Sequence, residues 1–264
     1  MAEKKKVNIG YMLVITVYYK FLINIDHCSQ CSDHLILLYV AMKLTHIRSQ
    51  IIRKHLYPIF VLIRFFIWII AKTTYRLKYE GRENIPKDGP AFLLPNHSTY
   101  IDWAILAATC KRPIRFVMYY QYYYIPVFKY IFQLAGCIPV AQYKDSPEIK
   151  EKAFKLMEEA IENGDLVCVF PEGTLTRDGE LVKFRSGYER VLERLNTKVI
   201  PIAMTGLWGS YFSRKGGRAL LKVPKPSRRK LYVKILEPIP KESATAEHVQ
   251  ELIHSEIDKM NQTF

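Results

Sequence analysis

From about Tyr79 onward, short apolar runs alternate with longer amphipathic stretches, and this alternation constrains the fold more than any other feature of the chain. The short runs have the length of strands, and the stretches between them repeat apolar residues at helical spacing. Strands separated by helices imply a mostly parallel sheet flanked by helices, so the sequence predicts an α/β domain over residues 79–264. The predicted strands are 91–94, 115–118, 138–141, 166–170, 199–203 and 231–235, and the predicted helices begin near residue 99 and cover 185–195 and 246–260.

A further helix carries signals at both of its ends. Ser146 followed by Pro147 is a favoured start, because a hydroxyl caps the first turn and proline suits the first helical position. Gly164 is a favoured end. The residues predicted to form its buried face are Ile149, Ala153, Phe154, Met157, Ala160 and Ile161.

Polar side chains follow two of the predicted strands. The segment Asn96–Asp102 comes directly after strand 91–94, and Phe170–Thr174 comes at the end of strand 166–170. Open α/β sheets place their sites at the carboxyl ends of strands, so the two segments are expected to meet. Together they supply an imidazole, a carboxylate near it and a second carboxylate on a Pro-Glu-Gly turn, which suits a general base acting on a hydroxyl.

The spacing of His97 and Asp102 limits how they can meet. Residues five positions apart lie on different faces of a helix, because successive side chains turn by about 100°. If Thr99 is the N-cap, Asp102 falls at the third helical position, and His97 lies before the helix and can fold back toward it. In the competing interpretation, Asp102 only caps the helix and His97 is a packed polar residue. The Glu-Gly turn favours the catalytic interpretation.

On these two segments the chain resembles the glycerolipid acyltransferases, which transfer a fatty acyl group from a thioester to a glycerol hydroxyl. Their hallmark blocks are Asn-His-x4-Asp, matched at 96–102, and Phe-Pro-Glu-Gly-Thr, matched at 170–174. The likeness extends from about Tyr79 to about Phe212. Segments 170–179 and 206–210 look closest to bacterial acyltransferases of the lysophospholipid-recycling kind.

The resemblance implies a mechanism without a covalent acyl-enzyme. His97 would take the proton of the acceptor hydroxyl, a role that contributes about 10²- to 10⁴-fold, and Asp102 would orient the imidazole. Backbone N–H groups near the strand ends would stabilise the oxyanion. The donor would be acyl-coenzyme A or acyl-carrier protein, with no metal and no further cofactor. Ser98 and Cys168 are not predicted to be nucleophiles.

The resemblance also implies a set of residues for the acceptor. Glu172 and Gly173 would bind its glycerol part, although Glu172 could instead be a solvent-exposed turn acid. Arg185 is the candidate for holding the phosphate through paired hydrogen bonds. The full predicted substrate-binding set is Asn96, Glu172, Gly173, Thr174, Arg177 and Arg185.

Two positions depart from the family pattern. Many members that act on lysophosphatidate have arginine directly after Phe-Pro-Glu-Gly-Thr, where this chain has Leu175 and places Arg177 two positions later. The block at 136–142 often ends in arginine, and here it ends in Gln142. Both changes remove positive charge, so the sequence favours a lysophospholipid with a phosphodiester head group over lysophosphatidate.

The net charge of +14 and the aromatic content of 13% are typical of proteins that bind an anionic membrane or a nucleic acid. The basic residues border apolar segments, at 4–6, 53–54 and 72–78, and no nucleic-acid-binding signature accompanies them. We therefore predict a phospholipid membrane surface as partner and no nucleic acid. The scattered cysteines favour the cytoplasmic face. The competing functions are an inactive lipid-binding protein and, on charge alone, a nucleic-acid-binding protein.

Residues 1–78 are predicted to be a membrane-associating helical segment. Its apolar stretches at 7–25, 35–44 and 56–71 are short or interrupted, which favours helices in the membrane interface over spanning helices. A helix pair packed on the enzyme's own core is the alternative. The Cys/His tract at 27–34 could bind a metal, but a polar turn is the better interpretation. The tyrosine-rich stretch at 119–128 could lie in the head-group layer, line the acyl path or pack in the core.

Overall fold

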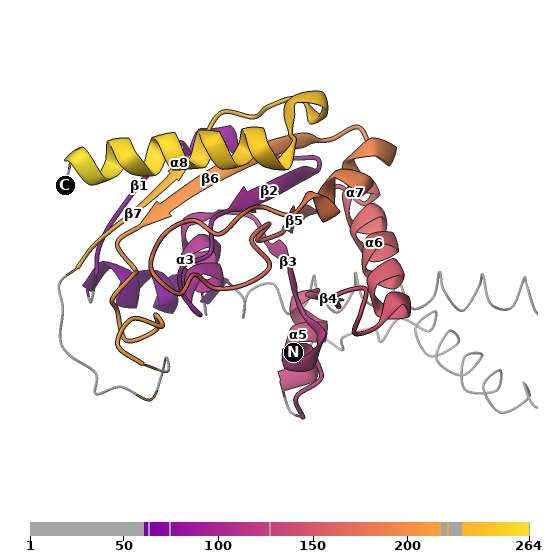
Figure 1. Cartoon of the computed structure of the whole chain (residues 1–264), viewed down its shortest axis with the longest axis horizontal. Helices are drawn as coiled ribbons and strands as arrows, with labels where there is room; N and C mark the ends of the chain where they lie inside the picture. The colour runs from indigo at the N-terminus through magenta and orange to yellow at the C-terminus, as the bar shows by residue number, and fades with distance from the viewer. Residues whose placement is uncertain are drawn as a thin grey trace, which may run out of the picture. The chain divides into compact units, whose positions relative to one another are not determined.

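The computed structural model describes residues 61–263, apart from residues 63, 74, 127, 218–220 and 222–228. In this part of the chain seven strands form one sheet in the order β1-β7-β6-β2-β5-β3-β4 (Figure 1). Neighbouring strands are parallel, except that β7 runs antiparallel to β6. The strands are β1 Arg76–Glu80, β2 Ala91–Pro95, β3 Ile114–Tyr119, β4 Ile138–Val140, β5 Leu166–Cys168, β6 Lys198–Thr205 and β7 Lys230–Ile235.

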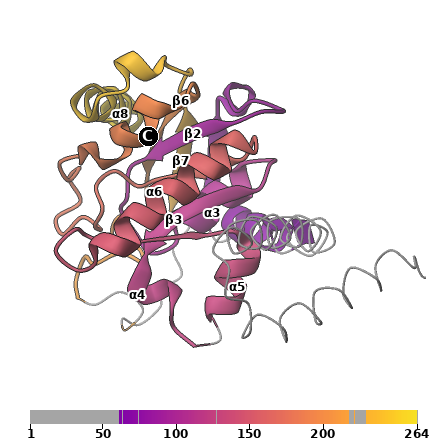
Figure 2. The same ribbon diagram turned by 90° about the vertical axis from the view of Figure 1, so that its right-hand side faces the viewer.

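Helices cover both faces of this sheet, as Figures 1 and 2 show. A buried cluster on one face joins the sheet to α6, α7 and α8, and a second cluster on the other face joins it to α3 and the helical residues 64–73. The predicted α/β class with a mostly parallel sheet is confirmed. The helices are α3 Asp102–Thr109, α4 Tyr120–Tyr123, α5 Phe128–Ala135, α6 Pro147–Glu162, α7 Glu189–Arg194 and α8 Ala246–Thr263.

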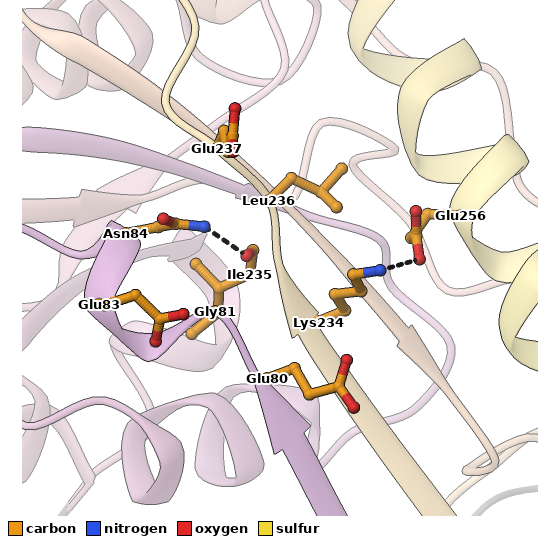
Figure 3. Close-up of a pocket in the computed structure, with 9 residues that line it drawn as sticks. All are labelled: Glu80, Gly81, Glu83, Asn84, Lys234, Ile235, Leu236, Glu237 and Glu256. Carbon is orange, nitrogen blue, oxygen red and sulfur yellow. Dashed lines mark hydrogen bonds and ion pairs between the residues drawn. The ribbon is translucent and has the colours of Figure 1, made fainter.

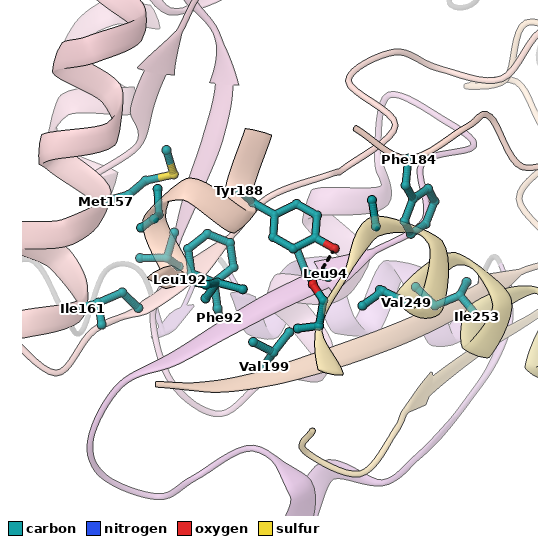
Figure 4. Packing of buried hydrophobic residues seen from close by; sticks show 14 of the residues in the cluster. Phe92, Leu94, Met157, Ile161, Phe184, Tyr188, Leu192, Val199, Val249 and Ile253 are labelled. Atoms are coloured by element: carbon teal, nitrogen blue, oxygen red, sulfur yellow. Dashed lines mark hydrogen bonds between the residues drawn. The ribbon is translucent and has the colours of Figure 1, made fainter. Parts of the chain in front are cut away.

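The residues of strand β2 are apolar throughout because both faces of the strand are covered. Successive side chains of a strand point to opposite faces. Phe92 and Leu94 lie in the cluster under α6, α7 and α8, whereas Ala91 and Leu93 lie in the cluster on the other face. Figure 4 shows Phe92 and Leu94 among the side chains of the first cluster. Every residue of β2 is buried, as a central strand covered on both sides requires.

Helix α6 begins and ends where its sequence signals predict. The Ser146 hydroxyl accepts a hydrogen bond from the backbone N–H of Ile149 at 3.3 Å, and Pro147 occupies the first turn. Gly164 adopts a left-handed φ of 78° just past the end of the helix. Most of its predicted apolar face is buried: Ala153, Phe154, Met157, Ala160 and Ile161.

Several boundaries differ from the predictions. Strand β1 was not predicted, although Leu77 and Tyr79 alternate with charged residues as in a half-buried strand. Strand β5 ends at Cys168 and not at Phe170. The helix predicted to start at Arg185 is a 3₁₀ turn, Ser186–Tyr188, followed by α7. Two further 3₁₀ turns are Arg82–Asn84 and Lys241–Ser243.

The predicted N-terminal features fall mostly outside the described residues. These features are the apolar stretches at 7–25 and 35–44, the Cys/His tract at 27–34 and the start of the stretch at 56–71. Among the residues that the structure describes, no helix combines the length and the apolar character needed to cross a bilayer. The division of the chain at residue 78 stays a prediction.

The described part of the last apolar stretch is helical and has two different faces. Ala71 is buried, and Trp68 packs against the core. Phe65, Phe66 and Ile70 are at least half exposed. One face of this helix therefore packs on the domain, and the other presents large apolar side chains to the surface. The competing interpretation was a helix pair packed on the core, and its other helix lies outside the described residues.

Candidate active site

The loop that follows β2 is held to the neighbouring strand by Asn96. Its side-chain amide donates to the carbonyl of Met204 at 2.9 Å, and its side-chain oxygen accepts from the backbone N–H of Met204 at 2.7 Å. Asn96 is buried, and both polar atoms of its carboxamide are engaged with β6. The pairing sets the point at which the chain leaves the sheet and turns toward His97.

His97 and Asp102 meet directly. Nδ1 of His97 lies 2.9 Å from Oδ2 of Asp102, and the His97 ring stacks on Phe170 with the ring centroids 4.1 Å apart. Asp102 is fully buried, whereas His97 is partly exposed. Because Asp102 engages Nδ1, the second ring nitrogen, Nε2, takes no part in this contact. Among the described residues, no hydrogen bond engages Nε2.

The Asp102 carboxylate accepts three further hydrogen bonds. The backbone N–H groups of Ser98 and Thr99 donate to Oδ2 at 2.6 and 2.8 Å, and the Thr99 hydroxyl donates to Oδ1. The prediction that Thr99 is the N-cap is wrong, since Ile101 is the N-cap and Asp102 opens α3. Residues 99–101 form a turn that brings the carboxylate back over the loop. The same carboxylate therefore binds both the imidazole and the backbone ahead of the helix. The competing interpretation, in which Asp102 only caps the helix, is wrong, since no side chain caps α3 and Asp102 contacts His97.

Glu172 lies beneath the same loop, with its carboxylate turned into the protein. Oε1 accepts from the backbone N–H of His97 at 2.5 Å, and Oε2 accepts from the backbone N–H of Val182 at 3.0 Å. The residue is only 1% exposed. Burial raises the pKa of Glu172 to about 7; the two backbone donors act against this rise, and the charge of Asp102 adds to it. The alternative of a solvent-exposed turn acid is therefore excluded.

Gly173 and Arg185 lie side by side at the outer end of this turn. Gly173 has a left-handed φ of 62°, and a Cβ at this position would lie 3.2 Å from Nε of Arg185. The backbone N–H of Arg185 donates to the carbonyl of Pro171 at 2.9 Å, which fixes the approach of the two segments. Thr174 and Arg177 are exposed nearby in the sequence, while Leu175 is buried. No contact joins Arg177 to Arg185 among the described residues.

A further loop, at residues 176–179, was not predicted from the sequence and contacts His97. The backbone N–H of Thr176 donates to the carbonyl of His97 at 3.3 Å, and the Thr176 hydroxyl binds Asp178 at 2.9 Å. Gly179 has a left-handed φ of 105°, and a Cβ there would lie 2.5 Å from Nε1 of Trp208. The Asp-Gly dipeptide is the turn signal that could have revealed this loop.

Cys168 is buried in the core, and burial raises the pKa of its thiol well above the usual value. Such a thiol is a poor nucleophile, in keeping with the prediction that Cys168 takes no catalytic part. Among the described residues, no group of three metal-binding side chains is present.

A cavity of about 610 Å³ lies elsewhere, beside β1 and β7 (Figure 3). Lys234 pairs with Glu256 at 2.6 Å in its wall, and the Asn84 side chain donates to the carbonyl of Ile235 at 2.9 Å. Strands β7 and β6 separate β1 from β2, and none of the predicted site residues lines the cavity.

Comparisons with known proteins find similar sequences among the acyltransferases. A sequence model of the acyltransferase family matches residues 76–205, about half of the chain. The chain is 29% identical over 133 residues to a chloroplast 1-acyl-sn-glycerol-3-phosphate acyltransferase of Arabidopsis thaliana, covering 50% of this chain and 36% of that protein. It is 30% identical over 156 residues to a 1-acyl-sn-glycerol-3-phosphate acyltransferase of Pseudomonas aeruginosa, covering 58% of each.

Among solved structures, the fold is similar to that of the 1-acyl-sn-glycerophosphate acyltransferase PlsC from Thermotoga maritima. The TM-score is 0.58 at 19% sequence identity, covering 83% of this chain and 97% of that chain. These likenesses place the domain among the acyltransferases. Over residues 76–205 the chain matches the acyltransferase family, and the two curated relatives similar to it are named 1-acyl-sn-glycerol-3-phosphate acyltransferases. It spans between 36% and 58% of the length of the two curated relatives named above. The finer likeness to lysophospholipid-recycling enzymes stays a prediction.

Proposed function

We propose that this protein transfers a fatty acyl group from an acyl thioester to the free glycerol hydroxyl of 1-acyl-sn-glycerol 3-phosphate. The observation that carries this proposal is the 2.9 Å contact between His97 and Asp102 on the loop after β2, next to the Glu-Gly turn. The acceptor is taken from the names of the relatives in Arabidopsis thaliana and Pseudomonas aeruginosa.

In the proposed reaction, Nε2 of His97 takes the proton of the acceptor hydroxyl while the hydroxyl oxygen attacks the thioester carbonyl carbon. The new C–O bond gives a tetrahedral oxyanion, which backbone N–H groups near the strand ends stabilise. The C–S bond then breaks, and the imidazolium returns the proton to the leaving thiolate. The negative charge of Asp102 stabilises the imidazolium while the proton is held there.

The acceptor's phosphate is proposed to bind Arg185, whose guanidinium group lies beside Gly173 at the exposed end of the turn. A guanidinium can hold a phosphate through two parallel hydrogen bonds. Thr174 and Arg177 supply further polar groups on the same stretch of chain. Arg177 is exposed where Leu175 is buried, so position 177 can offer the charge that position 175 lacks. This favours lysophosphatidate despite the departure from the family pattern.

A phospholipid surface, on its cytoplasmic face, is the proposed place of action. Two elements present large apolar side chains outward: the helical residues 64–73 expose Phe66 and Ile70, and α5 exposes Phe128 and Ile131. None of the residues of α5 is buried, although the helix is mostly apolar and aromatic. Such surfaces suit insertion among lipid head groups, and the net charge of +14 favours anionic lipids.

The acyl donor is proposed to be acyl-coenzyme A or acyl-carrier protein. Both donors carry the acyl group as a thioester, so the chemistry at His97 is the same for either. Assays with each donor in turn, at a fixed acyl chain length, identify the one that is used.

The proposal is tested by measuring thioester consumption by the purified chain with lysophosphatidate and, separately, with lysophospholipids that have phosphodiester head groups. We expect the His97→Ala variant to lose about 10²- to 10⁴-fold in kcat. The matched control is His248→Ala, since His248 is exposed on α8 and is not one of the predicted site residues. Vesicle binding without thioester consumption would point to an inactive lipid-binding protein, and full turnover by His97→Ala would refute the mechanism.

A further inference from the structure

We propose that Glu172 is a positioning residue that holds the backbone of His97, and that it does not bind the acceptor's glycerol. This inference deepens the proposed function, on which it rests, because it assigns a different task to a residue that the family resemblance places in the substrate site. The evidence is the direction of the Glu172 side chain and the identity of its partners.

Both carboxylate oxygens of Glu172 are engaged by backbone donors. Oε1 accepts from the N–H of His97 and Oε2 from the N–H of Val182, so the side chain bridges the loop after β2 and the chain near residue 182. A carboxylate has further lone pairs, but a ligand needs a path to reach them. An exposure of 1% leaves no such path for a glycerol hydroxyl.

The loop that carries His97 is held from two sides by carboxylates. Glu172 binds the N–H of residue 97, and Asp102 binds the N–H groups of residues 98 and 99 together with the His97 ring. Three consecutive backbone donors thus have acidic acceptors. The carbonyl of His97 accepts from the N–H of Thr176, which belongs to the same segment as Glu172. The peptide groups on both sides of His97 are therefore fixed by the segment 172–176.

This arrangement bears on the chemistry through the direction of the imidazole. Asp102 can hold Nδ1 only if the backbone of residue 97 keeps its place, because the ring turns about bonds that begin at that backbone. A displacement of about 1 Å can cost about 10²-fold in rate. Glu172 then acts on kcat through His97, while contact with the acceptor is left to the exposed residues of the turn, Gly173 and Thr174, and to Arg185.

The first test compares Glu172→Gln with wild type under the acyl-transfer assay. The amide keeps one acceptor oxygen and places an N–H₂ group against one of the two backbone donors. A hydrogen bond to a charged group contributes about 1.5–3 kcal/mol, so in an assay above pH 7, where the Glu172 carboxylate is ionised, kcat is expected to fall by about 10- to 100-fold. The KM for lysophosphatidate is expected to stay within about threefold, since no acceptor contact is lost. A KM raised tenfold or more with kcat retained would overturn the inference.

The matched control is Glu180→Gln. Glu180 is an exposed acid on the neighbouring loop, and its change is expected to leave kcat and KM unaltered. If Glu172→Gln does not fold, Glu172→Asp is assayed in its place, because a carboxylate that is shorter by one methylene cannot reach both donors at once.

A second test does not depend on activity. The chain has seven histidines, so labelling them with ¹⁵N gives at most seven amide signals, and the signal of His97 is assigned from its loss in a His97→Gln variant. The His97 amide is expected to exchange with solvent slowly in wild type and about 10- to 100-fold faster in Glu172→Gln. A fast-exchanging His97 amide in the folded wild-type chain would contradict the inference. If wild type shows no acyl transfer, the proposed function fails, and the exchange rates still decide the task of Glu172.

Discussion

Asp102→Asn is the substitution that separates the charge of the Asp102 carboxylate from its geometry. The side chain keeps its shape, and its remaining oxygen can occupy the place of Oδ2, where it meets His97 Nδ1 and the N–H groups of Ser98 and Thr99. The new N–H₂ group then faces the Thr99 hydroxyl, which can turn to accept from it. The loop is therefore expected to keep its contacts while each of them becomes weaker.

The magnitude follows from the number of charged contacts. A hydrogen bond to a charged acceptor contributes about 1 kcal/mol more than one to a neutral acceptor. Weakening the three bonds from the Ser98 N–H, the Thr99 N–H and the Thr99 hydroxyl is therefore expected to reduce the free energy of unfolding by about 3 kcal/mol. The loss in kcat is larger, because the imidazolium is no longer stabilised by a negative charge. In the serine-protease triad this change costs about 10⁴-fold, and we expect about 10²- to 10⁴-fold here.

The measurements are kcat and KM for acyl transfer and the free energy of unfolding from urea titration. The control is Asp88→Asn, an exposed acid on the loop before β2, for which neither quantity should change. If Asp102→Asn kept more than half of the wild-type kcat, the orienting role of Asp102 would be refuted. If kcat fell by the expected amount while the free energy of unfolding stayed the same, the two backbone contacts and the hydroxyl contact would be shown to contribute little to the stability of the fold.

Three further outcomes are expected. Burial raises the pKa of Glu172 from 4.5 to about 7. The contribution of Glu172 to the free energy of unfolding is therefore fully present below pH 4.5, and about 3 kcal/mol is lost as the pH rises through 7. Urea unfolding should show this loss in wild type and not in Glu172→Gln. Gly179→Ala places a Cβ 2.5 Å from Trp208 at a left-handed φ, so it should lower the melting temperature, whereas Gly187→Ala, with open space around it, should not. Arg185→Ala should raise the KM for lysophosphatidate about tenfold with kcat nearly unchanged, and an unchanged KM would exclude Arg185 from the phosphate site.

Much of the fold can be predicted from the sequence because the signals are local. A buried central strand such as β2 needs an unbroken apolar run, and a helix such as α6 carries its own start at Ser146 and its own stop at Gly164. Strand β1 was missed because it is short, lies at the edge of the sheet and follows a longer apolar stretch. Its pairing with β7, and the reversal of direction between β7 and β6, depend on contacts between residues far apart in the chain.

The residues of the candidate site were predicted by their motifs, and the approach of His97 to Asp102 was predicted with them. The spacing of the two residues alone was also compatible with a helix cap, and only the turn at 99–101 decides for the direct contact. Sequence position also could not tell whether the Glu172 side chain points outward or inward. That direction depends on two backbone N–H groups, at residues 97 and 182, that folding brings together from different loops.

The sequence by itself determined which residue types stand at the ends of β2 and β5, because local pattern sets where strands end and which side chains follow them. The tertiary structure alone decided which of those side chains are exposed and which are buried against the loop. Burial and hydrogen-bond partners are properties of the packed chain, and they turn Asn96 and Glu172 inward while leaving His97 partly exposed and Arg185 exposed.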